Sequence, residues 1–229
     1  CEFTDLQKHD LNLVLQKRYA LLNWQQGSGK TAAVYHRAKY LLKFRKAKNV
    51  IILAPAIATN MTWIPFLTIN KERFRTIQTA GDLNNIPEGT FLVVSTSMLR
   101  KLKRGLMRFV KRTSGKLCLV FDESDEITNP TSQRTRNILC IFRRLRYKIL
   151  DTGTTTRNNI AELYSQFELL YNNSVNMICW SPQVYHENRD HEIEEENNPD
   201  YGTPFPAFRG HVLFRACHCP GKATVFGIE

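Results

Sequence analysis

The stretch Trp24-Gln25-Gln26-Gly27-Ser28-Gly29-Lys30-Thr31 decides the fold. A short apolar run at residues 19–22 precedes it, and a helical pattern at residues 32–44 follows it. Glycines allow the backbone amides of such a loop to point inward at phosphate oxygens, and the following helix adds the positive end of its dipole. Strand, glycine-rich loop and helix therefore stand in the order of a P-loop, and the sequence predicts a phosphate-binding site.

The residues of this loop have expected roles. Lys30 would reach the β- and γ-phosphates of ATP, and the Thr31 hydroxyl would ligate Mg²⁺. Trp24 stands where the full motif has its first glycine, so the pattern is incomplete. The alternative is an ordinary glycine turn at a helix start, followed by a chance Lys-Thr pair. The candidate ATP-binding residues are Gln26, Gly27, Ser28, Gly29, Lys30 and Thr31.

A second group of candidate residues follows the apolar run at residues 117–121, which is typical of a fully buried strand. The run ends in Asp122-Glu123-Ser124-Asp125. Beside a P-loop, Asp122 would hold Mg²⁺ through water, and Glu123 would polarise the attacking water. We therefore expect ATP and Mg²⁺ as cofactors, Glu123, Lys30 and Asp122 as catalytic residues, and Thr31 and Asp122 as Mg²⁺ ligands. A merely polar exit from the strand is the alternative.

The P-loop and the acidic segment are two of five sequence blocks. In their order and spacing, the five blocks resemble the ATPases of helicase superfamily 2, and among them the Swi/Snf-like DNA translocases. The resemblance extends from about residue 6 to residue 171. The similar segments are residues 26–31 (motif I), 50–55 with Trp63 (Ia), 91–99 (Ib), 122–132 (II) and 149–163 (III).

The resemblance implies an N-terminal RecA-like ATP-binding lobe that works with a second RecA-like lobe of the same chain. We find no trace of that second lobe in the 229 residues. The resemblance also implies residues that couple the state of the γ-phosphate to closure of the two lobes. These coupling residues are Asp125, Thr152, Gly153 and Thr154.

Some positions depart from the family. Thr155 replaces the proline of motif III, and Asp125 stands where Swi/Snf members usually carry histidine. Asp10 occupies the place of the glutamine in the adenine-contacting Gln motif, which leaves adenine selectivity open. Because Lys30 and Glu123 are retained, we expect a competent site. The alternative is a nucleic-acid-binding module with a decayed ATP site.

Alternating apolar runs and helical patterns predict the fold. Strands are expected near residues 18–23, 50–54, 76–79, 91–95, 117–122 and 147–152, and helices near 31–45, 59–69, 96–112, 133–143 and 159–171. Such alternation indicates a mostly parallel sheet that is covered on both faces. The predicted class is α/β, a three-layer RecA-like P-loop NTPase lobe, whose ligands bind beyond the C-terminal ends of the strands.

Charge supports a polyanionic partner. The net charge is +11, but residues 181–229 hold four basic and eight acidic residues, so the first 180 carry about +15. Residues 100–116 hold eight basic residues and no acidic one, which favours nucleic acid over a merely solvated helix face. With the resemblance, this implies double-stranded DNA, with a strand-separating DNA or RNA helicase as the alternative. The candidate nucleic-acid-binding residues are Thr96, Arg100, Lys101, Lys103 and Arg104.

The expected organisation is a lobe at residues 1–180, an acidic flexible loop at 181–200, and an appended segment or start of an inter-lobe insertion at 201–229. No run reaches the roughly 18 apolar residues of a membrane span. We expect a protein that is not secreted and has no membrane partner, cytoplasmic in a bacterium or virus and nuclear in a eukaryote. The six cysteines are expected to be reduced. Cys217-His218-Cys219 offers too few ligands for a zinc site.

A P-loop kinase or GTPase is the remaining alternative. A GTPase would carry a guanine-recognising Asn-Lys-x-Asp motif, but Asn70-Lys71 continues with Glu72-Arg73. Neither class accounts for the basic run at residues 100–116. The sequence therefore favours the motor lobe.

Overall fold

The computed structural model describes residues 3–15, 17–25, 27–113, 116–154, 160–171, 223–224 and 227–228. The chain divides into two compact units: unit 1 comprises residues 1–124 and 144–153, and unit 2 comprises residues 125–143 and 154–229. The predicted acidic loop at 181–200 and most of the predicted appended segment at 201–229 lie outside the described residues.

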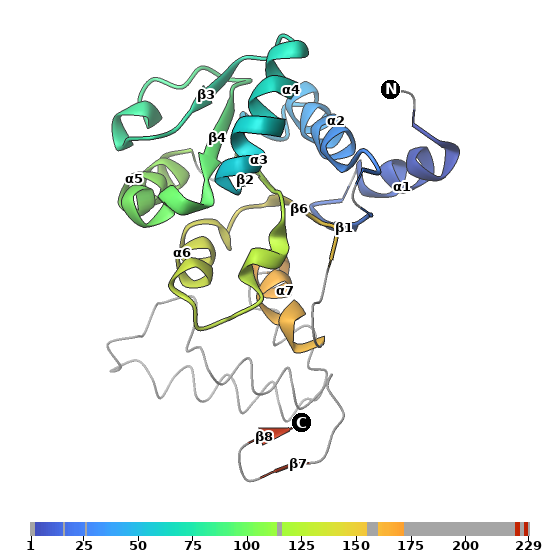
Figure 1. The fold of residues 1–229 in the computed structure, drawn as a ribbon. Helices are drawn as coiled ribbons and strands as arrows, with labels where there is room; N and C mark the ends of the chain where they lie inside the picture. Colours follow the sequence, from blue (N-terminus) through green and yellow to red (C-terminus); the bar gives the residue numbers. More distant parts are fainter. Residues whose placement is uncertain are drawn as a thin grey trace. The chain divides into compact units, whose positions relative to one another are not determined.

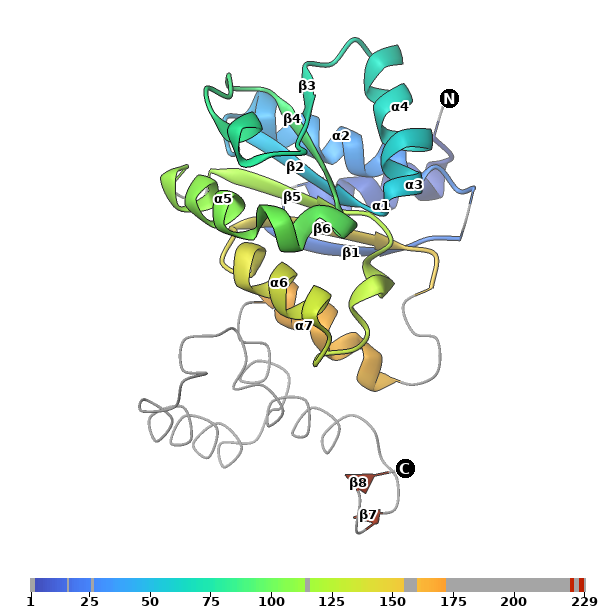
Figure 2. The same cartoon turned by 60° about the vertical axis from the view of Figure 1, so that its left-hand side comes forward.

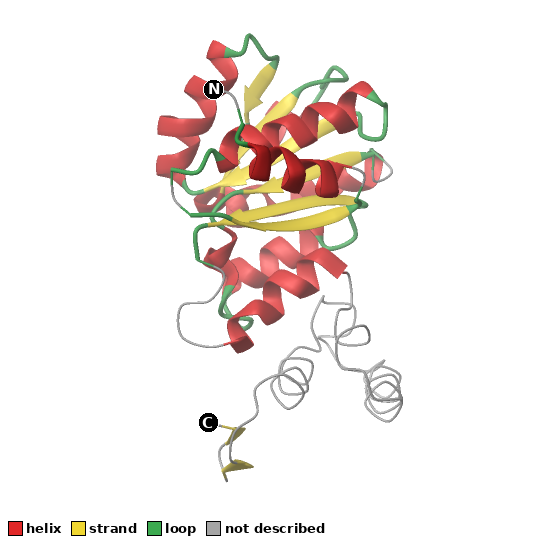
Figure 3. Ribbon diagram, turned by 90° about the vertical axis from the view of Figure 1, so that its right-hand side faces the viewer, coloured by secondary structure: helices red, strands yellow, loops and turns green. Residues whose placement is uncertain are grey.

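Unit 1 contains a six-stranded sheet in which every paired strand is parallel. The strands stand in the order β1-β6-β5-β2-β4-β3, side by side in Figure 3. Their bounds are β1 (Tyr19–Asn23), β2 (Asn49–Ala54), β3 (Phe74–Thr76), β4 (Phe91–Ser95), β5 (Leu117–Phe121) and β6 (Tyr147–Thr152). This order places β6 between the strand before the P-loop and the strand before Asp122, and all C-terminal strand ends lie at one edge.

One face of the sheet is covered by the helices of the first 69 residues (Figures 1 and 2). These are α1 (Asp5–Leu15), α2 (Lys30–Lys43), α3 (Ala56–Ala58), the π-helix η1 (Thr59–Trp63) and α4 (Ile64–Ile69). Strand side chains alternate between faces, and one set, including Val50, Val120 and Ile149, forms a buried core with α2 and α4 residues such as Val34 and Leu67.

The opposite face is covered by α5 (Leu99–Arg112), which lies across the sheet from α2 in both views (Figures 1 and 2). Its buried residues Leu99, Leu102, Leu106 and Phe109 recur at helical spacing and form one apolar stripe. The 3₁₀ turns η2 (Ala80–Leu83) and η3 (Thr96–Met98) flank this helix. The three-layer α/β prediction is confirmed, and the sheet is wholly parallel.

Three local predictions differ from the structure. The third strand is expected at residues 76–79 but forms at Phe74–Thr76, because it is an edge strand with one neighbour and tolerates Arg75 in its centre. The helix expected at residues 59–69 begins earlier, at Ala56 directly after Pro55. Helix α1 is absent from the prediction, because none of its residues is fully buried and its apolar side is weak.

In the described part of unit 2, the helices α6 (Gln133–Phe142) and α7 (Tyr164–Tyr171) lie against each other. Ser132 caps α6 by accepting a hydrogen bond from the Thr135 backbone N–H at 3.2 Å. Arg143 Nη1 and Glu168 Oε1 lie 2.9 Å apart and join the two helices. The unit also holds the 3₁₀ turns η4 (Ser124–Ile127, from the last residue of unit 1) and η5 (Ile160–Leu163), and an antiparallel pair, β7 (Ala223–Thr224) and β8 (Gly227–Ile228).

Within the part of the chain that the structure describes, no helix is both long and apolar enough to cross a membrane.

Candidate functional site

The glycine-rich loop has the backbone shape that a phosphate cradle needs. Gly27 has φ 76° and Gly29 has φ 81°, both in the left-handed region. A Cβ atom at Gly27 would meet no atom within 4 Å, so the backbone conformation, and not a lack of space, favours glycine there. Gly29 directly precedes α2, and its carbonyl accepts the first helical hydrogen bond, from Ala33 N at 3.2 Å. The loop therefore ends at a helix N-terminus, as a phosphate site requires.

Lys30 lies folded over this loop. Its Nζ donates to the carbonyl oxygens of Trp24 at 3.0 Å and Gln25 at 3.4 Å. Ser28 also contacts the Gln25 carbonyl, through its hydroxyl at 2.6 Å. The Lys30 ammonium is thus held inside the loop, where an incoming phosphate oxygen would compete for it. Gln26, the first predicted ATP-binding residue, lies outside the described residues.

Asp122 follows β5 at the same edge of the sheet. Its backbone N–H continues the pairing with β2 by donating to Leu53 O at 2.9 Å. The side chain is 7% exposed, and burial raises its pKa. Four interactions oppose that rise: the indole N–H of Trp63, the backbone N–H of Glu123, the charge of Lys30 and the side chain of Asp151. Glu123 has φ 54°, an uncommon conformation for a residue other than glycine and one that recurs at functional sites.

Trp63 fixes the position of Asp122. Its side chain is completely buried, and its Nε1 donates to Asp122 Oδ2 at 2.7 Å. Trp63 ends the π-helix η1, a geometry that is rare and often found at functional sites. The sequence places Trp63 beside motif Ia but gives no sign of this contact, because it joins residues 59 positions apart.

Asp151 is a site residue that the sequence predictions missed. It lies in β6, is 1% exposed, and neither of its Oδ atoms makes a hydrogen bond of normal geometry with the described residues. Burial raises its pKa well above the ordinary value, and the nearby charges of Asp122 and Glu123 raise it further, while Lys30 opposes them. The available signal was a carboxyl directly after the apolar pair Ile149-Leu150, in a strand predicted to be buried.

Helix α1 contributes two contacts to the loop. Gln7 Nε2 donates to the Ser28 carbonyl at 2.7 Å, and Trp24 Nε1 donates to Asp10 Oδ2 at 3.2 Å. Asp10 and Trp24 are two of the positions at which the sequence departs from the family. The glutamine whose amide contacts the P-loop is Gln7, three positions before Asp10.

The predicted coupling residues are divided between the two units. Thr152 is fully buried at the end of β6, and Gly153 follows it as the last residue of unit 1. Asp125 and Thr154 belong to unit 2, directly after Ser124 and Gly153 in the chain. Asp125 is 5% exposed and Thr154 is exposed. Their role in coupling stays a prediction.

Helix α5 carries a basic surface. Its cations are exposed except Lys103, which is half-buried, and none of them forms an ion pair with another described residue. Thr96, by contrast, is 5% exposed in the turn before the helix. We define the α5 basic surface as Arg100, Lys101, Lys103, Arg104, Arg108, Lys111 and Arg112.

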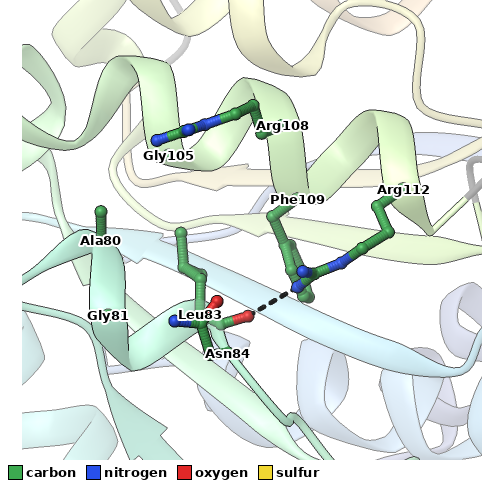
Figure 4. A pocket seen from close by; sticks show the side chains of 8 residues that line it. All are labelled: Ala80, Gly81, Leu83, Asn84, Gly105, Arg108, Phe109 and Arg112. Carbon is green, nitrogen blue, oxygen red and sulfur yellow. Dashed lines mark hydrogen bonds between the residues drawn. The ribbon is translucent and has the colours of Figure 1, made fainter.

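The C-terminal half of α5 borders a pocket of about 320 Å³ (Figure 4). Arg112 reaches across it and donates to the Leu83 carbonyl at 2.8 Å, and Arg108 lies one turn earlier on the same helix. At Gly105, a Cβ atom would lie 3.0 Å from Ala80 Cβ, so glycine permits the close approach of η2. The pocket is thus closed on one side by backbone and lined by two arginines.

The residues at the sheet edge fit ATP and Mg²⁺. The loop has its two left-handed glycines, and Lys30 is bonded to loop carbonyls that a phosphate could replace. The buried Asp151 carboxyl has no hydrogen bond of normal geometry among the described residues and interacts with Asp122. A divalent cation beside the two acids would favour their ionised forms, against the effect of burial. These observations concern the donor groups themselves and agree with the roles expected from the motifs.

Comparisons with known proteins agree with this geometry. The model of the family described as "Type III restriction enzyme, res subunit" matches residues 1–157. The chain is 27% identical over 175 residues to "ATP-dependent helicase FUN30" of Saccharomyces cerevisiae, an alignment that covers 71% of this chain and 15% of that protein.

Two solved structures share the fold. The Sulfolobus solfataricus SWI2/SNF2 ATPase core in complex with dsDNA matches 86% of this chain and 41% of its own, with a TM-score of 0.57 and 16% identity. The SWI2/SNF2 ATPase core domain from the same organism matches 93% of this chain and 42% of its own, with a TM-score of 0.56 and 16% identity. The predicted resemblance to the Swi/Snf-like ATPases of helicase superfamily 2 is confirmed. The chain spans less than half the length of each of these relatives.

Proposed function

Because the chain belongs to the family of the type III restriction enzyme res subunit, we propose that it is the ATP-binding first motor lobe of a DNA-dependent ATPase that translocates on duplex DNA. The observation that carries this proposal is the meeting of Lys30, Asp122 and Glu123 at one edge of the sheet. Lys30 affects the pKa of the Asp122 carboxyl, although the two residues are far apart in the sequence. Ligands of open α/β sheets bind at this edge.

Each residue then has a defined task. When ATP binds, the Lys30 ammonium gives up its hydrogen bonds to the carbonyls of Trp24 and Gln25 and contacts the β- and γ-phosphates instead. The Thr31 hydroxyl and Asp122 would hold Mg²⁺, whose charge would offset the charge that develops on the phosphate oxygens. Glu123 orients the attacking water and accepts its proton. Glu123 follows Asp122 with a strained φ of 54°, a backbone conformation that recurs at functional sites.

Duplex DNA is the proposed track. The α5 basic surface follows the motif Ib-like segment, and its exposed cations can neutralise phosphates without regard to base sequence. One fold relative is described as bound to dsDNA, which supports a duplex over a single strand. We place a second RecA-like lobe of the same chain opposite the ATP site, where its arginines would stabilise the transition state. Such a motor acts in the compartment that contains its DNA. This is the nucleus of a eukaryote, or the cytoplasm of a bacterium or an infected cell.

A strand-separating DNA or RNA helicase is the second candidate. It is favoured by the printed name of the yeast relative, an ATP-dependent helicase. A nucleic-acid-binding module with a decayed ATP site is the third. The residues that suggest decay are Asp10, Trp24 and Thr155. Asp10 and Trp24 bond to each other beside the glycine-rich loop, so these two do not favour that alternative, and Thr155 lies outside the described residues.

Two measurements test the proposal. The first is binding of a fluorescent ATP analogue to this chain, native and Lys30→Ala. Lys30-dependent binding supports the motor lobe, and equal binding by both proteins rejects the site.

The second measurement is the ATPase rate of the full-length protein with no nucleic acid, duplex DNA, single-stranded DNA or structured RNA, with Glu123→Gln as control. Stimulation by duplex DNA that is lost in Glu123→Gln supports the translocase. Stimulation by single strands or RNA alone supports the helicase instead.

A further inference from the structure

Asp151 lies in β6, between β1, which precedes the P-loop, and β5, which precedes Asp122. In the sheet register Leu22 of β1 pairs with Asp151, and Phe121 of β5 pairs with Leu150. Neighbouring strands lie about 4.8 Å apart. The P-loop strand is therefore on one side of Asp151, and the segment that begins with Asp122 is on the other.

The Asp151 side chain projects toward the face that α2 covers. Val120 and Ile149 belong to the buried core under α2, and strand side chains alternate with a period of two. Asp122 and Asp151 each follow one of these residues by two positions, so both carboxyls emerge on the α2 side. Helix α2 begins there with Lys30, whose charge acts on both carboxyls.

The close side-chain interaction of this carboxyl is with Asp122, another acid. Neither Oδ atom accepts a hydrogen bond from the described residues, although the side chain is 99% buried, with 1% exposed. Leaving a buried acceptor unpaired costs about 1–3 kcal/mol, and more for a charged one. Asp122, in contrast, is held by Trp63. The fold thus places two acids together, and Asp151 has no donor of normal geometry among the described residues.

We propose that Asp151 is a positioning residue for the metal of the ATP site: its carboxylate accepts hydrogen bonds from the hydration shell of the Mg²⁺ held by Thr31 and Asp122. This inference rests on the proposed function. In the described residues, no three His, Cys, Asp or Glu side chains can hold an ion by themselves, so the ion needs oxygens from nucleotide and water. A carboxylate behind that water orients it and adds one negative charge, which raises the affinity for the cation.

The test uses Mn²⁺ as a spectroscopic substitute for Mg²⁺ and a non-hydrolysable ATP analogue. Electron paramagnetic resonance gives the Mn²⁺ affinity of the analogue-bound chain for the native protein, Asp151→Asn and Glu88→Gln. Glu88 is an exposed acid paired with Lys48 before β4, away from the site, so its variant controls for the loss of one negative charge. We expect Asp151→Asn to weaken Mn²⁺ binding by about tenfold and Glu88→Gln to leave it unchanged.

Two further readouts separate this role from a structural one. In EDTA, Asp151→Asn should bind the analogue about as tightly as the native chain, because no cation is then present for the Asp151 carboxyl to position. Its melting temperature in EDTA should be no lower than the native value, and the rise on adding Mg²⁺ with the analogue should be smaller. A melting temperature lowered equally with and without metal would instead assign Asp151 to folding and overturn the proposal.

The outcomes distinguish this inference from the proposed function. Native-like Mn²⁺ affinity in Asp151→Asn, with Lys30-dependent binding of the analogue intact, would reject the role of Asp151 alone. Absence of Lys30-dependent binding in the native chain would reject the ATP site, and this inference with it.

Discussion

Trp24 donates its indole N–H to the Asp10 carboxylate across 3.2 Å. These are the positions where the first glycine of the P-loop motif and the glutamine of the Gln motif would stand, so the two departures from the family form one contact. The Trp24 carbonyl in turn accepts from Lys30 at 3.0 Å. Helix α1, the loop entry and Lys30 are therefore connected in series.

This connection predicts non-additive effects on nucleotide affinity. Asp10→Ala and Trp24→Phe should each weaken binding of the ATP analogue several-fold, because each frees the entry of the loop. The double variant should be little worse than either single one, which corresponds to a coupling energy of about 1 kcal/mol. Titration of the four proteins with a fluorescent analogue measures it. Strictly additive losses would show that the contact does not support the loop.

Substitution of Trp63 should weaken metal binding and leave nucleotide binding unchanged. Trp63→Phe keeps an aromatic ring in the buried position but removes the N–H that holds Asp122 at 2.7 Å. We expect about a tenfold loss of Mn²⁺ affinity, with little change in analogue binding in EDTA. Phe66→Leu is the matched control, since it removes the edge contact to the Trp63 ring without touching Asp122. An equal loss in that variant would attribute the effect to packing.

The strands and the loop chemistry could be predicted from the sequence because their signals are local. Residues 91–95 form β4 where an apolar run is found, and Gly29 and Lys30 follow a short motif. The contacts of Asp151 and Trp63 depend on strand order and register. Asp151 can face Asp122 only after β1 and β5 have paired with β6. The spacing of residues along the chain does not encode this pairing.

Helix α1 shows a different reason for a missed prediction. Its apolar residues Leu6 and Leu13 are 72% and 57% exposed, so its pattern lacks the stripe by which a packed helix is recognised. Its contacts are instead specific: Gln7 bonds to Ser28 O, and Arg37 of α2 donates to Val14 O at 3.1 Å. Tertiary hydrogen bonds of this kind leave no periodic signal.

Arg37 should be important for stability. The side chain has no exposed surface, and it donates to the carbonyls of Val14 and Lys17, which connect α1 to β1. Arg37→Met leaves these partly buried carbonyls without their donor and should lower the free energy of unfolding by about 2 kcal/mol. Urea unfolding measures it, and Arg18→Met, an exposed residue beside the same connection, should change it by less than about 0.5 kcal/mol. Equal effects of the two variants would contradict a specific role for Arg37.

Cys118 should resist alkylation at pH 8.5. It is completely buried in β5, and desolvation raises its pKa to about 11, although Arg37 opposes the rise. Because the folded chain favours the neutral thiol, the raised pKa of Cys118 contributes to the stability of the folded state. This contribution is complete below the ordinary thiol pKa of about 8.5 and is lost as the pH rises toward 11. Iodoacetamide labelling with peptide mass mapping should modify Cys118 only after unfolding in urea. The half-buried Cys140 should react first, and rapid labelling of Cys118 in the folded chain would refute the prediction.

The α5 basic surface should contribute to DNA affinity through charge alone. Arg100 and Arg104 are exposed and one helical turn apart, so they can contact neighbouring phosphates. Arg100→Ala/Arg104→Ala should weaken duplex binding about tenfold and reduce the slope of log K against log salt by about 0.9 for each phosphate that is no longer neutralised. Lys43→Ala/Lys46→Ala, at the end of α2, removes the same charge elsewhere and is the control. Fluorescence anisotropy across a salt series compares them, and equal losses in both variants would mean that net charge, and not this surface, governs binding.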